Sequence, residues 1–153
     1  DGPALVLGAG GAARAVISAL LSDGAPEIRL ANRTRSRADL LADQFGAKVR
    51  TVDWLHVEDA MDGVATIVNT TALGMTGQQA LPFSLKRAPR TALVNDIVYA
   101  PLITPLLEEA QSRRMRWVDG LGMLLHQGRP GFEAWYGVAP EVDEDLRAAM
   151  LAD

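Results

Sequence analysis

The stretch that decides the fold is ALVLGAGGAARAVISALL, which runs from Ala4 to Leu21. It opens with a short apolar run that ends at glycines, a pattern typical of a buried strand. Apolar residues then recur at the spacing of one helix face, at Ala13, Val16, Ile17, Leu20 and Leu21. Gly24 follows shortly afterwards, where a glycine suits the end of a helix. The stretch therefore predicts a strand, a tight turn and a helix.

Strands and helices are expected to alternate along the rest of the chain. The expected strands cover residues 4–7, 27–31, 48–52, 66–69, 91–96 and 116–119. After the first helix, others are expected from a capping box at Ser36 and Asp39 to about 45, over 57–61, and from Thr104-Pro105 to about 114. The chain after Gly120 is expected to be mainly helical, with breaks near 128–131 and 137–140 and a last helix over about 141–151.

This alternation predicts an α/β fold of the Rossmann type. Parallel strands need crossovers of the length seen here, so the pattern indicates a doubly wound parallel sheet of about six strands. A chain of 153 residues suits one domain of this kind. Residues 1–120 would form the sheet unit, and residues 121–153 would form helices beyond it.

The composition excludes several classes of function. A net charge of −4 and a pI near 5.1 argue against broad binding to nucleic acid or an anionic membrane. The absence of cysteine excludes disulfides and thiolate metal sites, and it permits a cytoplasmic location. His56 and His126 are far apart without a local carboxylate cluster, so no metal site is expected. Arg14 and the three glycines in residues 4–21 favour a soluble strand–helix unit over a membrane span.

Residues Gly8 to Ala13 fit the pattern G-x-G-x-x-[GA] between the expected strand and helix. Gly8 would allow the tight turn, and Gly10 would let the backbone approach a pyrophosphate, because any Cβ would intrude there. Ala13 would let the helix pack closely on the strand. The helix N-terminus would offer free N–H groups to the phosphates. A purely structural turn is the alternative, but the strand–turn–helix context favours dinucleotide binding.

The segment after the second expected strand favours NADP over NAD. It reads Asn32-Arg33-Thr34, with Arg35 and Arg37 following, and it lacks the carboxylate that NAD-specific sites direct at the ribose 2′-OH. Asn32 and Thr34 can hydrogen-bond a 2′-phosphate, and Arg33 can pair with it and stack on adenine. Arg37 is a second cation within reach, whereas Arg35 is expected to face solvent. Alone, this segment would be only the start of a basic helix, but the glycine loop about 20 residues earlier changes that interpretation.

Five motifs together resemble the shikimate/quinate dehydrogenase family. They are GAGGAARA at 8–15; NRT at 32–34 with Arg37; NTTALGM at 69–75; DIVYAP at 96–101 with Thr104 and Leu106; and DGLGML at 119–124 with Gln127, Phe132 and Trp135. Their order and spacing match from Ala4 to about Trp135. The resemblance is to the C-terminal, NADP-binding domain of that family.

The resemblance implies roles for particular residues. Ile97 and Gly120 would line the nicotinamide end, Tyr99 and Gln127 would contact shikimate, and the C-terminal helices would pack back onto a substrate domain. The implied NADP contacts are Gly8, Ala9, Gly10, Gly11, Ala12, Asn32, Arg33, Thr34, Arg37, Thr70, Ile97, Gly120 and Met123.

The resemblance also implies that no catalytic residue lies in this chain. The family's Lys–Asp pair and its Ser-rich carboxylate site belong to an N-terminal domain, and the only lysines here are Lys48 and Lys86. The chain opens with Asp1-Gly2-Pro3 rather than Met, so we interpret it as a fragment. Such a fragment would bind cofactor without turning over substrate by itself, because hydride transfer at a carbinol also needs a proton-transfer group.

The expected activity of the parent enzyme is reversible reduction of 3-dehydroshikimate to shikimate with NADPH, in aromatic amino acid biosynthesis. Two alternatives remain open: a paralogue that prefers quinate, and a non-catalytic NADPH-sensing module, against which Tyr99 and Gln127 argue.

Several other residues carry structural expectations. Asp96 and Asp119 are expected to cap helices or order loops rather than form an acid pair. Trp117 is expected in a core, and Arg14 could serve either structure or phosphate. Three aromatic residues near the C-terminus, Phe132, Trp135 and Tyr136, would face the missing domain or form an exposed patch.

Overall fold

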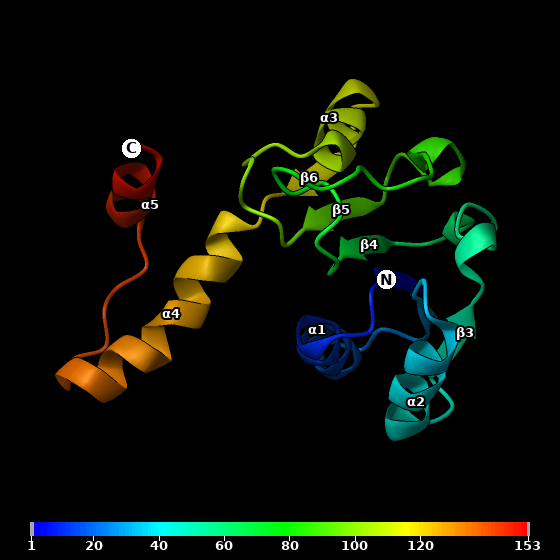
Figure 1. The fold of residues 1–153 in the computed structure, drawn as a ribbon, viewed down its shortest axis with the longest axis horizontal. Coiled ribbons are helices and arrows are strands. Elements are labelled where there is room, and N and C mark those ends of the chain that lie inside the picture. The colour runs from blue at the N-terminus through cyan, green and yellow to red at the C-terminus, as the bar shows by residue number, and fades with distance from the viewer. Residues whose placement is uncertain (1, 153) are drawn as a thin grey trace.

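The computed structural model describes residues 2–152 as a parallel sheet with a long helix projecting from one end (Figure 1). The strands are β1 (Ala4–Leu7), β2 (Ile28–Ala31), β3 (Val49–Val52), β4 (Thr66–Asn69), β5 (Leu93–Asp96) and β6 (Arg116–Val118). The α-helices are α1 (Gly11–Ser22), α2 (Arg35–Phe45), α3 (Pro105–Ser112), α4 (Leu121–Tyr136) and α5 (Glu144–Leu151). Short 3₁₀ turns are η1 (Trp54–His56), η2 (Asp59–Met61) and η3 (Leu85–Arg87).

The sheet has the strand order β3-β2-β1-β4-β5-β6, and every pair is parallel. Strand β1 lies at the centre, with Leu7 level with Ala31 of β2 on one side and with Asn69 of β4 on the other. The chain order reverses between β1 and β4, which is the point where ligands bind in such sheets. The predicted fold class, including the six strands, is confirmed.

The alternation of side chains along β1 explains why the sheet is covered on both faces. Ala4 and Val6 belong to one buried cluster, which α1 and α2 complete with Ile17 and Leu41. Leu5 and Leu7 point to the opposite face and join a second cluster. That second cluster contains Leu107 of α3 as well as residues of η2 and η3, among them Met61 and Leu85. A strand buried on both faces reads as a continuous apolar run, which is the pattern of β1.

Most element positions follow the prediction to within a few residues. Strands β1 and β4 have the predicted bounds, and Thr104 caps α3 through a hydrogen bond to its side chain from Leu107 N, with Pro105 in the first turn. Gly24 has a φ of 89° just beyond α1, as a helix-ending glycine does. The end of α3 at Ser112 comes earlier than predicted, and Arg114 adopts a positive φ of 56°.

The predicted capping box at Ser36 is wrong. Helix α2 begins at Arg35, with Thr34 at the N-cap position, so Ser36 already lies inside the first turn. Asp39 pairs instead with Arg35, one turn earlier, at 3.0 Å. The first turn of α2 therefore carries an ion pair at i, i+4 spacing, and the Thr34 side chain at its N-cap makes no capping hydrogen bond.

Two further predictions about helices are corrected. Residues 57–61 do not form one short helix; Asp53 caps the separate turn η1, and η2 follows. Helix α4 does not break near 128–131 but continues through Pro130. Residues 126–130 are exposed, so the carbonyl that loses its donor at Pro130 stays accessible to water.

The prediction that Trp117 packs in a core is also wrong. It lies on β6, which is an edge strand of the sheet, and 36% of its surface is exposed. Helix α3 packs beside β6, but all three residues of this strand remain exposed.

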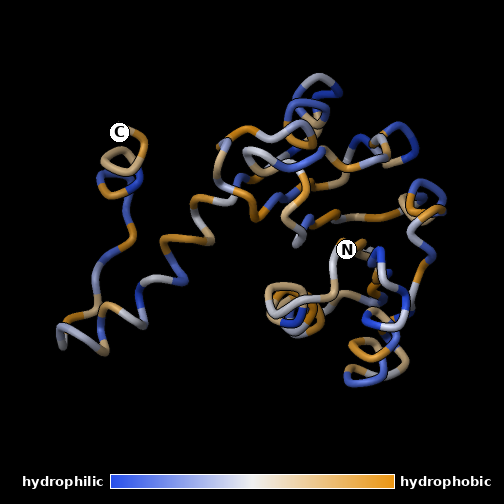
Figure 2. The backbone as a smooth tube through the Cα atoms, viewed as in Figure 1, coloured by the Kyte–Doolittle hydropathy of each residue, from blue (hydrophilic) through white to orange (hydrophobic). Residues whose placement is uncertain are grey.

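Helices α4 and α5 stand away from the body of the sheet, and hydrophobic residues continue along α4 (Figures 1 and 2). Phe132 and Tyr136 stack on each other at a centroid distance of 4.5 Å yet stay exposed, and Trp135 is 81% exposed. Within residues 2–152, no helix is long and apolar enough to span a membrane.

Candidate functional site

The glycine loop follows β1 at the point where the strand order reverses. Gly8 has a φ of 103°, which non-glycine residues rarely adopt, and a Cβ there would lie 2.7 Å from Thr70 Oγ1. The Thr70 hydroxyl donates to the carbonyl of Leu7 at 2.6 Å. Gly8 is thus required by both backbone angle and space, and the loop rests directly on the end of β4.

The rest of the loop is open. Gly10 precedes α1 as its N-cap without a side-chain hydrogen bond, and a Cβ at Gly10 or Gly11 would meet no atom within 4 Å. Among residues 2–152, no side chain accepts from the first N–H groups of α1, which leaves the positive end of the helix free for an anion. Ala13 is fully buried against the sheet, in keeping with its predicted packing role.

A pocket of about 230 Å³ lies near this loop, because its lining includes Thr71, whose methyl group would lie 3.1 Å from a Cβ on Gly8. Asn32 holds its own segment in shape, because its Nδ2 donates to the carbonyl of Thr34 at 2.8 Å. The Thr34 hydroxyl makes no capping bond to α2 and stays exposed. The lining residues contain one cation and no carboxylate: Asn32, Arg33, Trp54, Thr71, Ala72, Leu73 and Gln78.

The arginines near this pocket differ in whether they are already paired. Arg35 is held by Asp39 at 3.0 Å and donates to Thr51 at 2.7 Å. Arg14 donates to Gln44, which gives it a structural role between α1 and α2. The side chains of Arg33 and Arg37, by contrast, form no hydrogen bond or ion pair with any residue from 2 to 152 and are exposed. Arg33, which also lines the pocket, is therefore available to a ligand.

A buried polar network ties together the ends of β4 and β5. Asp96 accepts hydrogen bonds from Asn69 Nδ2 at 2.9 Å, from the backbone N–H of Val98 at 3.0 Å, and from the Thr104 hydroxyl at 2.7 Å. Asn69 in turn accepts from the Thr71 hydroxyl at 2.7 Å. This confirms the expectation that Asp96 orders loops, and the network connects the pocket residue Thr71 to the segment after β5.

Burial raises the pKa of Asp96 above its ordinary value of 3.8, although its three hydrogen bonds act in the opposite direction. All three donors are uncharged groups. The native state therefore holds the proton of this carboxyl more tightly than the unfolded chain does. The contribution of the Asp96 carboxyl to the free energy of unfolding is fully present below pH 3.8, and it is lost as pH rises through the raised native pKa.

We expect Asp96→Asn to be much less harmful than Asp96→Ala. The amide oxygen can still accept from Asn69 and Val98, and no buried negative charge remains. Alanine leaves three buried donors unpaired, at a cost of about 2–4 kcal/mol. Denaturant unfolding between about pH 4 and pH 7 should show the Asn variant gaining stability relative to the native chain as pH rises. A constant difference across that range would contradict the assignment of the raised pKa.

The segments after β5 and β6 meet at Gly120. This glycine is buried, and a Cβ on it would lie 2.5 Å from both the carbonyl carbon of Ile97 and the carbonyl oxygen of Val98, and closer still to Ile97 O. The Ile97 N–H donates to Asn69 O at 3.1 Å, so β4 supports the same region. Ile97 and Gly120, two of the predicted site residues, are thus brought into direct contact.

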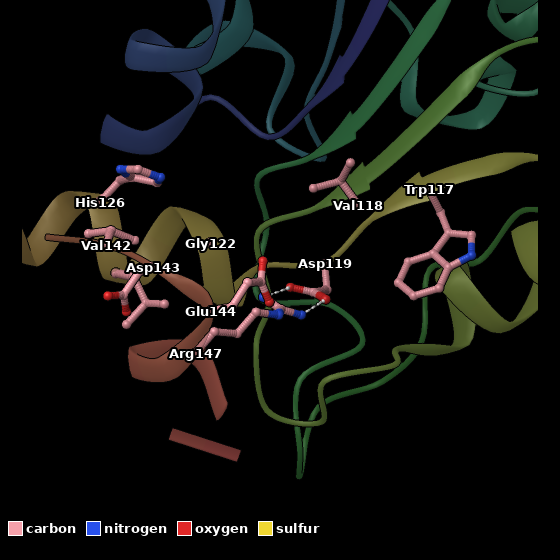
Figure 3. Close-up of a pocket in the computed structure, with 10 residues that line it drawn as sticks. Trp117, Val118, Asp119, Gly122, His126, Val142, Asp143, Glu144 and Arg147 are labelled. Carbon is pink, nitrogen blue, oxygen red and sulfur yellow. Dashed lines mark hydrogen bonds and ion pairs between the residues drawn. The ribbon is translucent and has the colours of Figure 1, made fainter. Parts of the chain in front are cut away.

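Asp119 orders the start of α4 and anchors α5. It accepts from the N–H of Leu121 at 3.0 Å. It also accepts from the Arg147 guanidinium at 2.5 and 3.2 Å (Figure 3). These bonds confirm the expectation that Asp119 caps a helix or orders a loop. The bond to Asp119 raises the pKa of Arg147. An open hollow of about 600 Å³ lies beside this pair, between β6, α4 and α5, and His126 lines it. This hollow lies at the β6 edge of the sheet, whereas Asn32 and Arg33 follow β2 on the other side of β1, so it is separate from the pocket near the glycine loop.

The remaining predicted residues are less closely gathered. Tyr99 is 48% exposed after β5, while Met123 and Gln127 lie on α4, half-buried and exposed respectively. The pocket also contains Thr71, which belongs to the NTTALGM motif, and two residues that the sequence analysis missed, Trp54 and Gln78. Trp54 follows β3 at the same edge of the sheet as the glycine loop, and that position was the signal available in the sequence.

Comparison with known proteins finds relatives over most of this chain. Residues 1–122 match the family described as Shikimate / quinate 5-dehydrogenase. The chain is 60% identical over 151 residues to the shikimate dehydrogenase (NADP(+)) of Jannaschia sp. strain CCS1, covering 99% of this chain and 54% of that protein. It is 55% identical over 151 residues to the protein of the same name from Paracoccus denitrificans, covering 99% and 54%. The chain thus spans about half the length of the curated relatives it matches.

Solved structures give the same result. Quinate dehydrogenase from Corynebacterium glutamicum in complex with NAD superposes with a TM-score of 0.87 at 31% identity, covering 99% of this chain and 55% of that one. Shikimate 5-dehydrogenase from Thermus thermophilus, in complex with NADP(H) and shikimate, gives a TM-score of 0.76 at 40% identity, covering 90% and 50%. On the match over residues 1–122, the chain belongs to the shikimate/quinate 5-dehydrogenase family.

Proposed function

We propose that this chain binds NADP at the edge of the sheet where the glycine loop follows β1. The observation that carries the proposal is the pocket lined by Arg33, which has no partner among residues 2–152, and by no carboxylate; its lining residue Thr71 also lies against Gly8 of the glycine loop. The pyrophosphate would lie against Gly8, Ala9, Gly10, Gly11 and Ala12. The 2′-phosphate would be bound by Asn32, Arg33 and Thr34, with Arg37 as a second cation.

The nicotinamide end would lie at the contact between the segments after β5 and β6. Ile97 and Gly120 would line it, and Thr70 and Met123 would complete the cofactor contacts. Thr70 already supports the loop through its bond to the carbonyl of Leu7. NADPH supplies the hydride when bound, and the role of these residues is to orient its ring and exclude water.

For the whole protein, we propose reversible reduction of 3-dehydroshikimate to shikimate with NADPH. The curated relatives are named shikimate dehydrogenase (NADP(+)). The pocket of this chain contains a cation, as expected of an NADP site, and lacks the carboxylate expected of an NAD site. The proton that accompanies the hydride would come from a Lys–Asp pair in an N-terminal substrate domain, and neither Lys48 nor Lys86 lines the pocket described here. A cytoplasmic location is proposed with this function, which a cysteine-free sequence permits.

Helices α4 and α5 would belong with that substrate domain rather than with the sheet, so that residues 1–120 bind cofactor and 121–153 return toward the substrate. Their separation from the sheet and the exposed aromatic residues of α4 support this division (Figure 1). Tyr99 and Gln127 would then contact the substrate from the cofactor side.

A quinate-preferring enzyme is the second candidate, favoured by the likeness to the Corynebacterium glutamicum quinate dehydrogenase. The two candidates predict different cofactor preference as well as different substrates, because that structure holds NAD. Comparing shikimate with quinate as substrates of the complete protein would separate them.

Calorimetric titration of the 153-residue chain with NADP⁺ and NAD⁺ tests the cofactor proposal. We expect NADP⁺ to bind at least about 100-fold more tightly, since two charge-assisted hydrogen bonds to the 2′-phosphate each contribute about 1.5–3 kcal/mol. Binding of neither nucleotide to a chain with a folded circular-dichroism spectrum would overturn the proposal. Equal binding of both would retain the dinucleotide site and reject the NADP assignment.

A further inference from the structure

The pairing of β2 with β3 brings Trp54 to the pocket. Ala31 of β2 is level with Val52 of β3, so the segments after these two strands leave the sheet side by side. The first segment carries Asn32 and Arg33, and the second carries Trp54 in η1. All three side chains line the pocket of about 230 Å³.

The pocket lining combines polar and apolar side chains. Asn32 and Arg33 offer hydrogen-bond donors and a positive charge, which suit a phosphate. The indole of Trp54 and the side chains of Ala72 and Leu73 offer apolar surface, which suits the face of a planar base. A nucleotide with a phosphate on its ribose presents these two chemistries next to each other.

The Trp54 ring is held in place rather than loosely exposed. It is half-buried and packs against Phe83 in an edge-on arrangement, with ring centroids 5.3 Å apart and planes at 72°. Both rings pack on the core cluster that lies beneath the sheet. A ring fixed in this way loses little conformational entropy when a ligand packs against it.

We propose that Trp54 is an affinity-determining residue for the adenine of the bound dinucleotide, forming the aromatic wall of its pocket together with the Arg33 guanidinium. This inference rests on the proposed NADP-binding function. It assigns the 2′-phosphate to the polar side of the pocket and the base to the Trp54 side. Trp54 contributes to binding of the adenosine half only and has no part in hydride transfer.

The first test measures affinities by calorimetry for NADP⁺ and for adenosine 2′,5′-bisphosphate, which lacks the nicotinamide half. Trp54→Ala should weaken both ligands by the same factor, about tenfold, as expected for loss of one aromatic–base contact. Trp54→Phe should retain most of the affinity, because a smaller ring still offers a face. Trp135→Ala is the matched control, since this tryptophan is exposed on α4. The affinity of this variant for both ligands should equal that of the native chain.

A fluorescence measurement makes the result independent of folding defects. The double variant Trp117→Phe/Trp135→Phe retains Trp54 as its one tryptophan, since the sequence has three. Its emission should change on titration with adenosine 2′,5′-bisphosphate and saturate at the dissociation constant found by calorimetry. Trp54→Phe in the otherwise native chain should show no such change.

The outcomes separate the inference from the function on which it rests. If the native chain binds NADP⁺ but Trp54→Ala binds it equally well, or if emission from Trp54 does not respond, the Trp54 assignment is wrong and the cofactor proposal stands. If the folded native chain binds neither ligand, both are rejected. Loss of NADP⁺ affinity without loss of adenosine 2′,5′-bisphosphate affinity would place Trp54 at the wrong half of the cofactor and reject the inference.

Discussion

Replacing Gly120 by alanine is expected to destabilise the chain by at least about 3 kcal/mol, enough to threaten folding altogether. A Cβ at this position would lie 2.5 Å from the carbonyl carbon of Ile97 and from the carbonyl oxygen of Val98. Both are backbone atoms, so no side chain can rotate away to make room. The φ of Gly120 is −80°, which alanine adopts easily, so the expected loss comes from the clash and not from backbone strain.

Gly122→Ala is the matched control for this prediction. Gly122 lies two residues further along in the first turn of α4, and a Cβ there would meet no atom within 4 Å. Alanine in that helical position should stabilise the chain by about 0.5–1 kcal/mol. Chemical denaturation of both variants measures the difference, and similar stabilities for the two would show that the segments after β5 and β6 do not approach each other as described.

The contact at Gly120 also indicates how stability and the proposed function are coupled. The same approach that excludes a Cβ fixes the position of Ile97, which would line the nicotinamide end. Asn69 supports this segment from the other side, because its carbonyl accepts from Ile97 and its side chain donates to Asp96. A glycine that the family resemblance marks as a cofactor residue is therefore required by packing even before a cofactor is bound.

The sheet could be predicted from the sequence because each of its strands is a local apolar run with a clear end. Strand β1 is apolar throughout and stops at Gly8, and β4 stops at Asn69, so their bounds follow from the pattern alone. Helix starts were less certain because several polar residues can cap. Ser36 had the right chemistry, but Thr34 occupies the N-cap position and Asp39 pairs with Arg35.

Properties that depend on neighbours distant in the chain could not be predicted. Trp117 has the hydrophobicity of a core residue, but its exposure follows from β6 being at the edge of the sheet. A proline usually ends a helix, yet α4 continues through Pro130, where the surrounding residues are exposed. Both errors came from using local preference where position in the fold decides.

The residues of the candidate site show the same difference between what a local pattern predicts and what distant neighbours decide. The glycine loop and Asn32-Arg33-Thr34 could be found because each motif is contiguous and carries its own chemistry. Trp54 was missed because its one sequence signal is that it follows an expected strand; its place beside Asn32 and Arg33 comes from the pairing of β2 with β3. The sequence analysis already expected Arg35 to face solvent, and the structure adds that Asp39 and Thr51 hold its side chain while Arg33 stays without a partner among residues 2–152.

That distinction leads to the expectation that Arg33→Ala reduces affinity for NADP⁺ by about 10- to 100-fold, while affinity for NAD⁺ changes much less. Arg33 lines the pocket and has no partner among residues 2–152, so its charge is available to the 2′-phosphate. NAD⁺ lacks that phosphate and would lose only contact with the guanidinium face. The selectivity, measured as the ratio of the two dissociation constants by calorimetry, should therefore fall in the variant.

Arg35→Ala is the control, because it removes the same charge from the same segment. Its guanidinium is already engaged by Asp39 and Thr51, so its loss should weaken NADP⁺ binding by no more than about threefold through the general field. The effect of Arg33→Ala should persist at high salt better than that of Arg35→Ala, since a direct pair is screened less than a distant charge. If the two variants lose NADP⁺ affinity equally, or if Arg33→Ala weakens NAD⁺ as much as NADP⁺, then Arg33 acts through general charge or stacking on adenine, and 2′-phosphate recognition must be assigned to other residues.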